Sequence, residues 1–139
     1  MKNLRRVGGI VLFTLMMIAC GNDSSYIEGE TADGNFILVD EVSQRVSEDM
    51  IVKVVGITDT RCPIGDVCST AGYVKVDMQI YADKEFTDFC INYSKLHEDN
   101  CDTIKGYTIS ILNVTPHPYS GAPEIDSLDY RITISVEKN

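Results

Sequence analysis

The chain has 139 residues, with 12 lysines and arginines against 21 aspartates and glutamates, which gives a net charge of −9. This length is enough for one domain with its own hydrophobic core. An acidic chain without a basic stripe repels nucleic acid and anionic lipid, so we expect no nucleic-acid partner.

Residues 1–19 have the pattern of a bacterial signal peptide. A short basic region precedes an apolar run over residues 7–19, which is too short to span a bilayer comfortably. The run ends in Met17-Ile18-Ala19-Cys20, which resembles the lipobox of bacterial lipoproteins, with Met17 in place of the usual leucine. The resemblance implies that Cys20 is acylated. An ordinary signal peptide with an incidental cysteine and an N-terminal membrane anchor are the alternatives.

The residue after Cys20 bears on the destination of the protein. Inner-membrane lipoproteins typically have aspartate there, whereas this chain has Gly21, so the resemblance implies the outer membrane. Acyl chains contribute about 0.8 kcal/mol per buried methylene and anchor the chain firmly. Cleavage before Cys20 leaves nine basic residues against 21 acidic ones, a net charge of −12. Residues 20–33 are polar and small, which predicts a flexible tether before a domain over residues 34–139.

The domain has the pattern of a β-protein. Strands are expected over residues 35–39, 50–58, 72–82, 85–91, 107–115 and 129–138, several of them with strict apolar–polar alternation. Only residues 40–49 hint at a helical turn, through Val42 and Val46. Six to seven short strands predict an all-β, Ig-like antiparallel β-sandwich, with a small barrel as the alternative.

Four cysteines follow the lipidation candidate, in a chain expected to reach an oxidising compartment. They allow three pairings, of which proximity in the sequence favours Cys62–Cys68 and Cys90–Cys101. Each bridge would close a small loop and contribute roughly 2–3 kcal/mol in the loop-entropy model. A zinc site is the competing interpretation, but no C-x-x-C pair is present and the two histidines stand apart.

The most distinctive segment, residues 59–72, reads Asp-Thr-Arg-Cys-Pro-Ile-Gly-Asp-Val-Cys-Ser-Thr-Ala-Gly. It resembles a family of small bacterial lipoproteins with an Asp-Ser/Thr-Arg-Cys-Pro segment, a second cysteine and an Ala-Gly pair that opens a strand. Residues 106–109, 116–118 and 129–130 are also similar, so the resemblance covers most of residues 50–139. Many members have tryptophan where Thr70 stands. The resemblance implies export and a β-sandwich, but no particular activity.

Two interpretations of this segment remain open. As a structural clasp, Pro63 fixes a torsion in the disulfide-closed turn, and Arg61 reaches a carboxylate or several carbonyls. As a binding loop, Arg61 and Pro63 are presented to a partner together with His117 and Tyr119 of the proline-rich loop over residues 116–123. A clamped loop with an arginine beside a cysteine is also similar to the presented loop of some protease inhibitors.

Catalytic signatures are weak. No nucleophile stands beside a base in a recognisable motif, and we find no phosphate loop or cofactor fingerprint, so we expect neither an enzyme nor a cofactor. A weak calcium candidate places four oxygen-bearing side chains within five residues, with a spacing that does not match the EF-hand loop: Glu98, Asp99, Asn100 and Asp102.

The sequence therefore predicts a lipid-anchored lipoprotein of the outer membrane that acts as a non-catalytic binding module. Its ligand would be a protein or a glycan. The alternative is a structural or accessory subunit of an envelope complex, and a hydrolase or protease inhibitor comes third.

Overall fold

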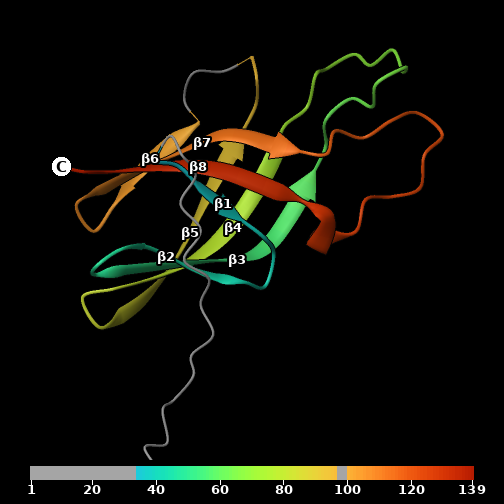
Figure 1. Cartoon of the computed structure of the whole chain (residues 1–139). Helices are drawn as coiled ribbons and strands as arrows, with labels where there is room; N and C mark the ends of the chain where they lie inside the picture. The colour runs from blue at the N-terminus through green and yellow to red at the C-terminus, as the bar shows by residue number, and fades with distance from the viewer. Residues whose placement is uncertain (1–33, 97–99) are drawn as a thin grey trace, which may run out of the picture.

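The computed structural model describes residues 34–96 and 100–139 (Figure 1). The expected signal peptide, Cys20 and the whole of the expected tether lie outside the described residues. The described chain forms eight strands and one 3₁₀ turn: β1 (Phe36–Leu38), β2 (Ser43–Ser47), β3 (Met50–Asp59), β4 (Val74–Ala82), β5 (Glu85–Tyr93), β6 (Cys101–Ile104), β7 (Tyr107–Thr115), η1 (Ser127–Asp129) and β8 (Arg131–Lys138).

The strands form two four-stranded sheets, and the predicted antiparallel β-sandwich is confirmed. The first sheet has the order β2-β3-β4-β5 and the second the order β1-β8-β7-β6. Every pair of neighbouring strands is antiparallel. The inner faces of both sheets enclose one core (Figure 1).

Alternation along each strand explains which side chains fill this core. In β4, Val74, Val76, Met78, Ile80 and Ala82 are all buried, while the residues between them are half-buried. Side chains two apart lie on the same face of a strand, so this pattern turns one face inward along its whole length. Fully burying a valine, isoleucine or methionine side chain contributes about 1.5–3 kcal/mol.

Strands β2 and β6 were not predicted from the sequence, and β2 lies where a helical turn was expected. The expected helical turn is wrong, because Gln44 and Val46 are the buried residues of strand β2. A spacing of four, as between Val42 and Val46, fits the same face of a helix and the same face of a strand equally well. Strand β6 has three exposed residues of four, so it carries little apolar signal.

A β-bulge interrupts each of the strands β3 and β7. In β3 the pairing with β4 shifts after Val54, and in β7 the pairing with β8 shifts after Ile111. The added residues, Val55 and Leu112, are 43% and 47% exposed. A bulge moves every later side chain to the opposite face. It therefore reverses which residues of β3 and β7 point inward at the end of the sandwich where the site lies.

The expected Cys90–Cys101 disulfide is absent from the structure, and both cysteines are exposed free thiols. Cys90 lies opposite Asp77, on the outer face of the first sheet. Cys101 lies opposite Ser110, on the outer face of the second sheet. The two thiols therefore point away from opposite faces of the sandwich.

Distance along the edge strand separates these cysteines as well. The Asn100 amide accepts a hydrogen bond from the Ser94 backbone N–H and donates one to its carbonyl, which holds the start of β6 near the end of β5. Cys90 lies four residues back along the chain from Ser94, roughly 13 Å at the rise of a strand. Since a disulfide needs Cα atoms within about 7 Å, proximity in the sequence predicted this pairing wrongly.

Candidate binding arm

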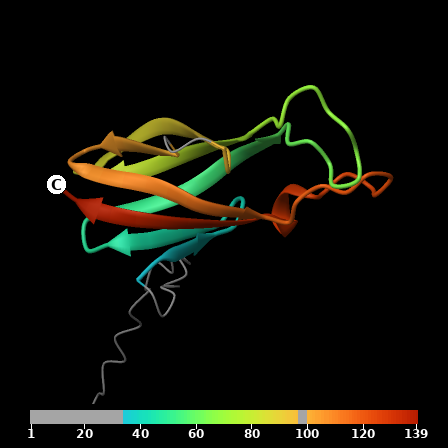
Figure 2. The ribbon, with the colours of Figure 1, turned by 90° about the horizontal axis from the view of Figure 1, so that it is seen from above.

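Two long loops project together from one end of the sandwich. The first arm loop, residues 60–73, joins β3 to β4, and the second arm loop, residues 116–130, joins β7 to β8. Figures 1 and 2 show both loops reaching beyond the strands, at the end away from the C-terminus. We call the two loops the arm. It unites the cysteine motif and the proline-rich loop, which lie about fifty residues apart in the sequence.

The base of the arm is a buried ion pair between Asp59 and Arg61, whose side chains are 8% and 6% exposed. The Arg61 guanidinium donates to both carboxylate oxygens of Asp59 and to the backbone carbonyls of Val114 and Pro116, at 2.8 and 2.7 Å. The Tyr130 hydroxyl donates to Asp59 Oδ2 at 3.0 Å. This cluster therefore ties the end of β3 in one sheet to β7 in the other sheet and to both ends of the second arm loop.

The two bulges place this cluster. Before the bulge in β3 the even-numbered residues are buried, and after it Ile57 and Asp59 turn inward. In β7 the odd-numbered residues are buried until the bulge, after which Val114 is buried. Without these shifts, Asp59 would point into solvent and could not face Arg61.

Burial and the arginine act in opposite directions on the Asp59 carboxyl. Burial favours its neutral form, but the hydrogen bonds and the charge of Arg61 outweigh that effect and lower the pKa of Asp59 below its ordinary value. Burial, followed by the hydrogen bond to Asp59, raises the pKa of Tyr130 to about 12. At neutral pH the cluster is therefore an aspartate, an arginine and a neutral tyrosine.

The first arm loop is held at its root by backbone pairing and at its tip by a disulfide. The amides of Thr60 and Cys62 donate to the carbonyls of Tyr73 and Ala71, both at 2.9 Å. Cys62–Cys68 is a disulfide, as predicted. Gly72 has φ 70°, and a Cβ there would lie 1.9 Å from the Thr60 carbonyl oxygen, so only glycine lets the two sides of the loop approach this closely.

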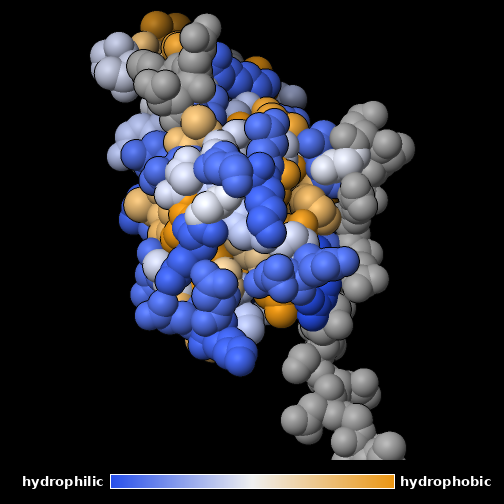
Figure 3. Space-filling model, turned by 90° about the vertical axis from the view of Figure 1, so that its left-hand side faces the viewer, coloured by the Kyte–Doolittle hydropathy of each residue, from blue (hydrophilic) through white to orange (hydrophobic). Residues whose placement is uncertain are grey.

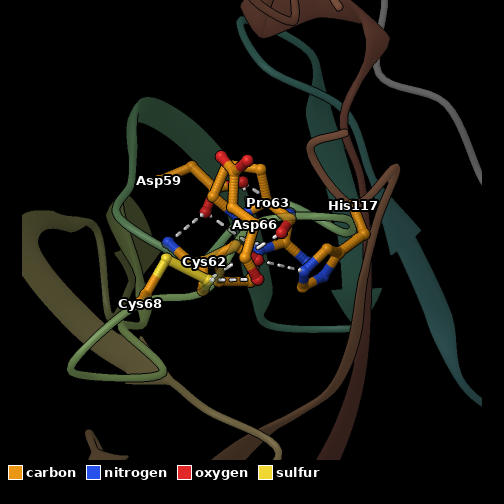
Figure 4. The surroundings of a disulfide bond; sticks show 7 residues. Asp59, Cys62, Pro63, Asp66, Cys68 and His117 are labelled. Carbon is orange, nitrogen blue, oxygen red and sulfur yellow. Dashed lines mark hydrogen bonds and ion pairs between the residues drawn. A yellow bond between two sulfur atoms is a disulfide. The ribbon is translucent and has the colours of Figure 1, made fainter. Parts of the chain in front are cut away.

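The second arm loop is fixed against the first. Ile64 N–H donates to the Pro118 carbonyl at 2.8 Å, and Ser120 N–H donates to the Ile64 carbonyl at 3.0 Å. His117 Nε2 lies 3.0 Å from the Cys62 carbonyl oxygen, and Figure 4 shows its ring directed at that group beside the disulfide. Strand-like pairing and one imidazole thus make the two loops a single body.

A cleft of about 420 Å³ opens on one side of the arm. Arg61, Asp59 and Tyr130 contribute to its lining, and its other walls include Pro63, Pro118, Tyr119, Pro123 and Glu124. Large apolar side chains remain exposed on the arm: Ile64 at 49%, Val67 at 104%, Tyr119 at 60% and Leu128 at 54%. The opposite end of the molecule, which faces the viewer in Figure 3, is covered largely by hydrophilic side chains.

The structure brings the four predicted binding-loop residues together in the arm, but in different roles. Arg61 is buried and holds the base, so it does not present its charge to a partner. Pro63 and His117 are half-buried at the contact of the two loops, and Tyr119 is exposed beside the cleft. Sequence reasoning did not select Tyr130 as part of this site, and no local signal links it to Asp59, 71 residues away.

Half of the weak calcium candidate falls outside the described residues, namely Glu98 and Asp99. Asn100 is engaged with Ser94 through both ends of its amide, and Asp102 accepts a hydrogen bond from the Thr103 N–H. Among residues 34–96 and 100–139, no group of three or more acidic, histidine or cysteine side chains is arranged to hold a metal ion.

Comparisons with protein-family models, with curated proteins and with solved structures found no match to this chain. In the part of the chain that the structure describes, no helix has the length and apolar character needed to cross a membrane.

Proposed function

We propose that this protein is a lipid-anchored lipoprotein of the bacterial outer membrane and that it binds a partner through the arm without catalysing a reaction. The observation that carries the proposal is the joining of two loops from different sheets into one projecting body with exposed apolar side chains. The acylated Cys20 would fix the domain to the membrane, and the tether would give the arm reach.

The internal contacts of the arm support a binding role. Binding with a mobile loop costs the free energy of ordering that loop. Here the disulfide, the Arg61 contacts and the pairing of Ile64 with the second loop order the arm before any partner arrives. Exposed Tyr119 has the size and the amphipathic character of residues that dominate interfaces.

The polar groups of the arm favour binding over catalysis. Asp59 accepts from Arg61 and Tyr130, so its oxygens serve to hold the base of the arm. The Nε2 atom of His117 faces a backbone carbonyl, an arrangement that positions a loop. A general acid or base needs a group that can reach a substrate proton, and these side chains are directed at the protein itself.

Site-specific photo-crosslinking in living cells tests the binding role. A photoreactive phenylalanine analogue at Tyr119 should give a discrete adduct with a partner. The same analogue at Phe86, which is 66% exposed on β5 outside the arm, is the matched control and should give none. Equal adducts at both positions, or no adduct at Tyr119, would contradict the proposal. Stoichiometric co-purification of the partner with the unmodified protein would favour the accessory-subunit alternative.

A separate experiment tests the anchor. Metabolic labelling with a fatty acid should mark the wild-type protein and should not mark Cys20→Ala, which should leave the membrane fraction. Full membrane retention of Cys20→Ala would exclude the lipid anchor while leaving the binding role of the arm open.

A further inference from the structure

We infer that the occupant of the cleft is a protein segment that is both basic and apolar. This inference rests on the proposed binding function and specifies the chemistry of the partner. Three features of the arm lead to it: its charge, the apolar side chains around its cleft, and the use of the polar groups at the cleft floor.

The arm is strongly one-sided in charge. The arm together with Asp59 at its base contains five acidic residues and one basic residue, and no lysine. The single basic residue, Arg61, is buried against Asp59 and offsets only that carboxylate. Asp66, Asp126 and Asp129 are exposed on the arm, and Glu124 is exposed at the cleft. Such a surface attracts a cationic partner and repels nucleic acid and anionic lipid.

Glu124 is the acidic group best placed to contact an occupant. It lines the cleft, and within the described residues its carboxylate forms no salt bridge. A lysine or arginine of a partner can therefore approach it without breaking an internal ion pair. The flexible stem of such a residue can also cover apolar surface beside its charge.

Part of the cleft wall is formed by apolar rings. Pro63, Pro118 and Pro123 contribute ring surfaces, and Tyr119 stands exposed beside them. Proline has no N–H donor, so these three residues offer an occupant no backbone donor. Aliphatic and aromatic side chains of a partner can replace water here at little polar cost.

The cleft floor argues against a glycan as the occupant. A sugar is held by many hydrogen bonds to its hydroxyl groups, yet the floor uses its polar atoms internally. The Arg61 donors go to Asp59, Val114 and Pro116. The Tyr130 hydroxyl donates to Asp59. The side chains that remain at the cleft include rings, the Ser127 hydroxyl and the Glu124 carboxylate, and this carboxylate favours a basic peptide over an uncharged glycan.

Peptide binding to the purified full chain in non-ionic detergent tests this chemistry, with empty micelles as the blank. The probes are three short fluorescent peptides of equal length that alternate lysine with leucine, lysine with serine, and glutamate with leucine. The lysine–leucine peptide should bind most tightly, and its affinity should fall as salt is added. The lysine–serine peptide tests charge alone, and the glutamate–leucine peptide tests apolar contact alone.

Variants locate the binding. Tyr119→Ala should weaken binding of the lysine–leucine peptide by about tenfold, and Glu124→Gln by about threefold. The matched controls Phe86→Ala and Glu137→Gln, which remove an exposed ring and an exposed charge outside the arm, should leave it unchanged. All four side chains are exposed, so circular dichroism should report the same fold for each variant.

Several results would overturn the inference. These are equal affinity for the lysine–serine peptide, insensitivity to both arm variants, and displacement of the peptide by an uncharged chito-oligosaccharide at comparable concentration. If the photo-crosslink at Tyr119 still forms in cells while the lysine–leucine peptide does not bind, the arm is a binding site and only the inferred partner chemistry is wrong. If neither occurs, the proposed function fails as well.

Discussion

Replacing Arg61 with methionine tests the central structural claim, which is that a buried guanidinium joins the two sheets at the base of the arm. Methionine keeps most of the apolar stem but removes every donor. The variant leaves the Asp59 carboxylate, 8% exposed, with the Tyr130 hydroxyl as its remaining side-chain donor. It also removes the donors to the carbonyls of Val114 and Pro116.

The expected cost is large for one substitution. Removing one partner of a buried ion pair typically destabilises a protein by about 3–5 kcal/mol, because the other charge stays buried without compensation. For a domain of this size, 1 kcal/mol shifts Tm by roughly 4–8 °C. We therefore expect Arg61→Met to lower Tm by more than about 10 °C. Replacing an arginine that is exposed to solvent would instead change the free energy of unfolding by no more than about 0.5 kcal/mol.

Thermal and urea denaturation of the wild type, Arg61→Met and Arg131→Met measure this difference. Arg131 is an exposed arginine whose guanidinium donates to the Leu128 carbonyl, so it is the matched control and should change little. The double variant Asp59→Asn with Arg61→Met removes the orphaned charge, and should be less destabilised than the sum of the two single variants. A loss below about 1 kcal/mol for Arg61→Met, or strict additivity, would refute the reasoning.

Three further predictions concern Asp59, Gly72 and the two free cysteines. The pKa of Asp59 is lower in the folded state than its ordinary value of 3.8, so its contribution to stability is present above that pH and is lost as the pH falls through the folded-state pKa. The difference in unfolding free energy between wild type and Asp59→Asn, followed by urea denaturation, should therefore shrink below pH 3.8; a constant difference would contradict the pairing. Gly72→Ala should destabilise the protein more than Gly121→Ala in the same measurement, because both glycines have positive φ but a Cβ at Gly72 would also lie 1.9 Å from a backbone atom. The backbone strain of an alanine at position 121 costs about 1–2 kcal/mol. Equal losses of stability for the two variants would exclude the close approach at Gly72. A maleimide should label both Cys90 and Cys101 in the native, unreduced protein, and mass spectrometry would detect the two adducts. If neither cysteine is labelled, the two form a disulfide after all.

Local patterns in the sequence were sufficient for much of the architecture. The alternation in residues 72–82 and 129–138 predicted strands β4 and β8, since a period of two is visible within a few residues and does not depend on the partner strand. The Cys62–Cys68 disulfide was also predicted correctly, because the two cysteines are only six residues apart in the sequence. The arm was recognised only in parts, as a clamped turn and as a proline-rich loop.

Other features were invisible because they depend on pairing between distant segments. The bulge at Val55 is a property of the register between β3 and β4, and the sequence of β3 alone does not predict it. The same is true of the contact between Tyr130 and Asp59. The Cys90–Cys101 pairing failed because closeness in the sequence does not report which face of which sheet a side chain occupies.

The sequence by itself thus determined the fold class, the acidic character and the clamped turn, all of which follow from residue type and short-range spacing. The tertiary structure decided the role of each site residue. It turned Arg61 inward and left Tyr119 exposed beside a cleft, although both had been predicted as members of one binding loop. The physical reason is that burial of a charge depends on the groups that surround it in space, here Asp59, the Val114 carbonyl of the other sheet and the Pro116 carbonyl of the second arm loop.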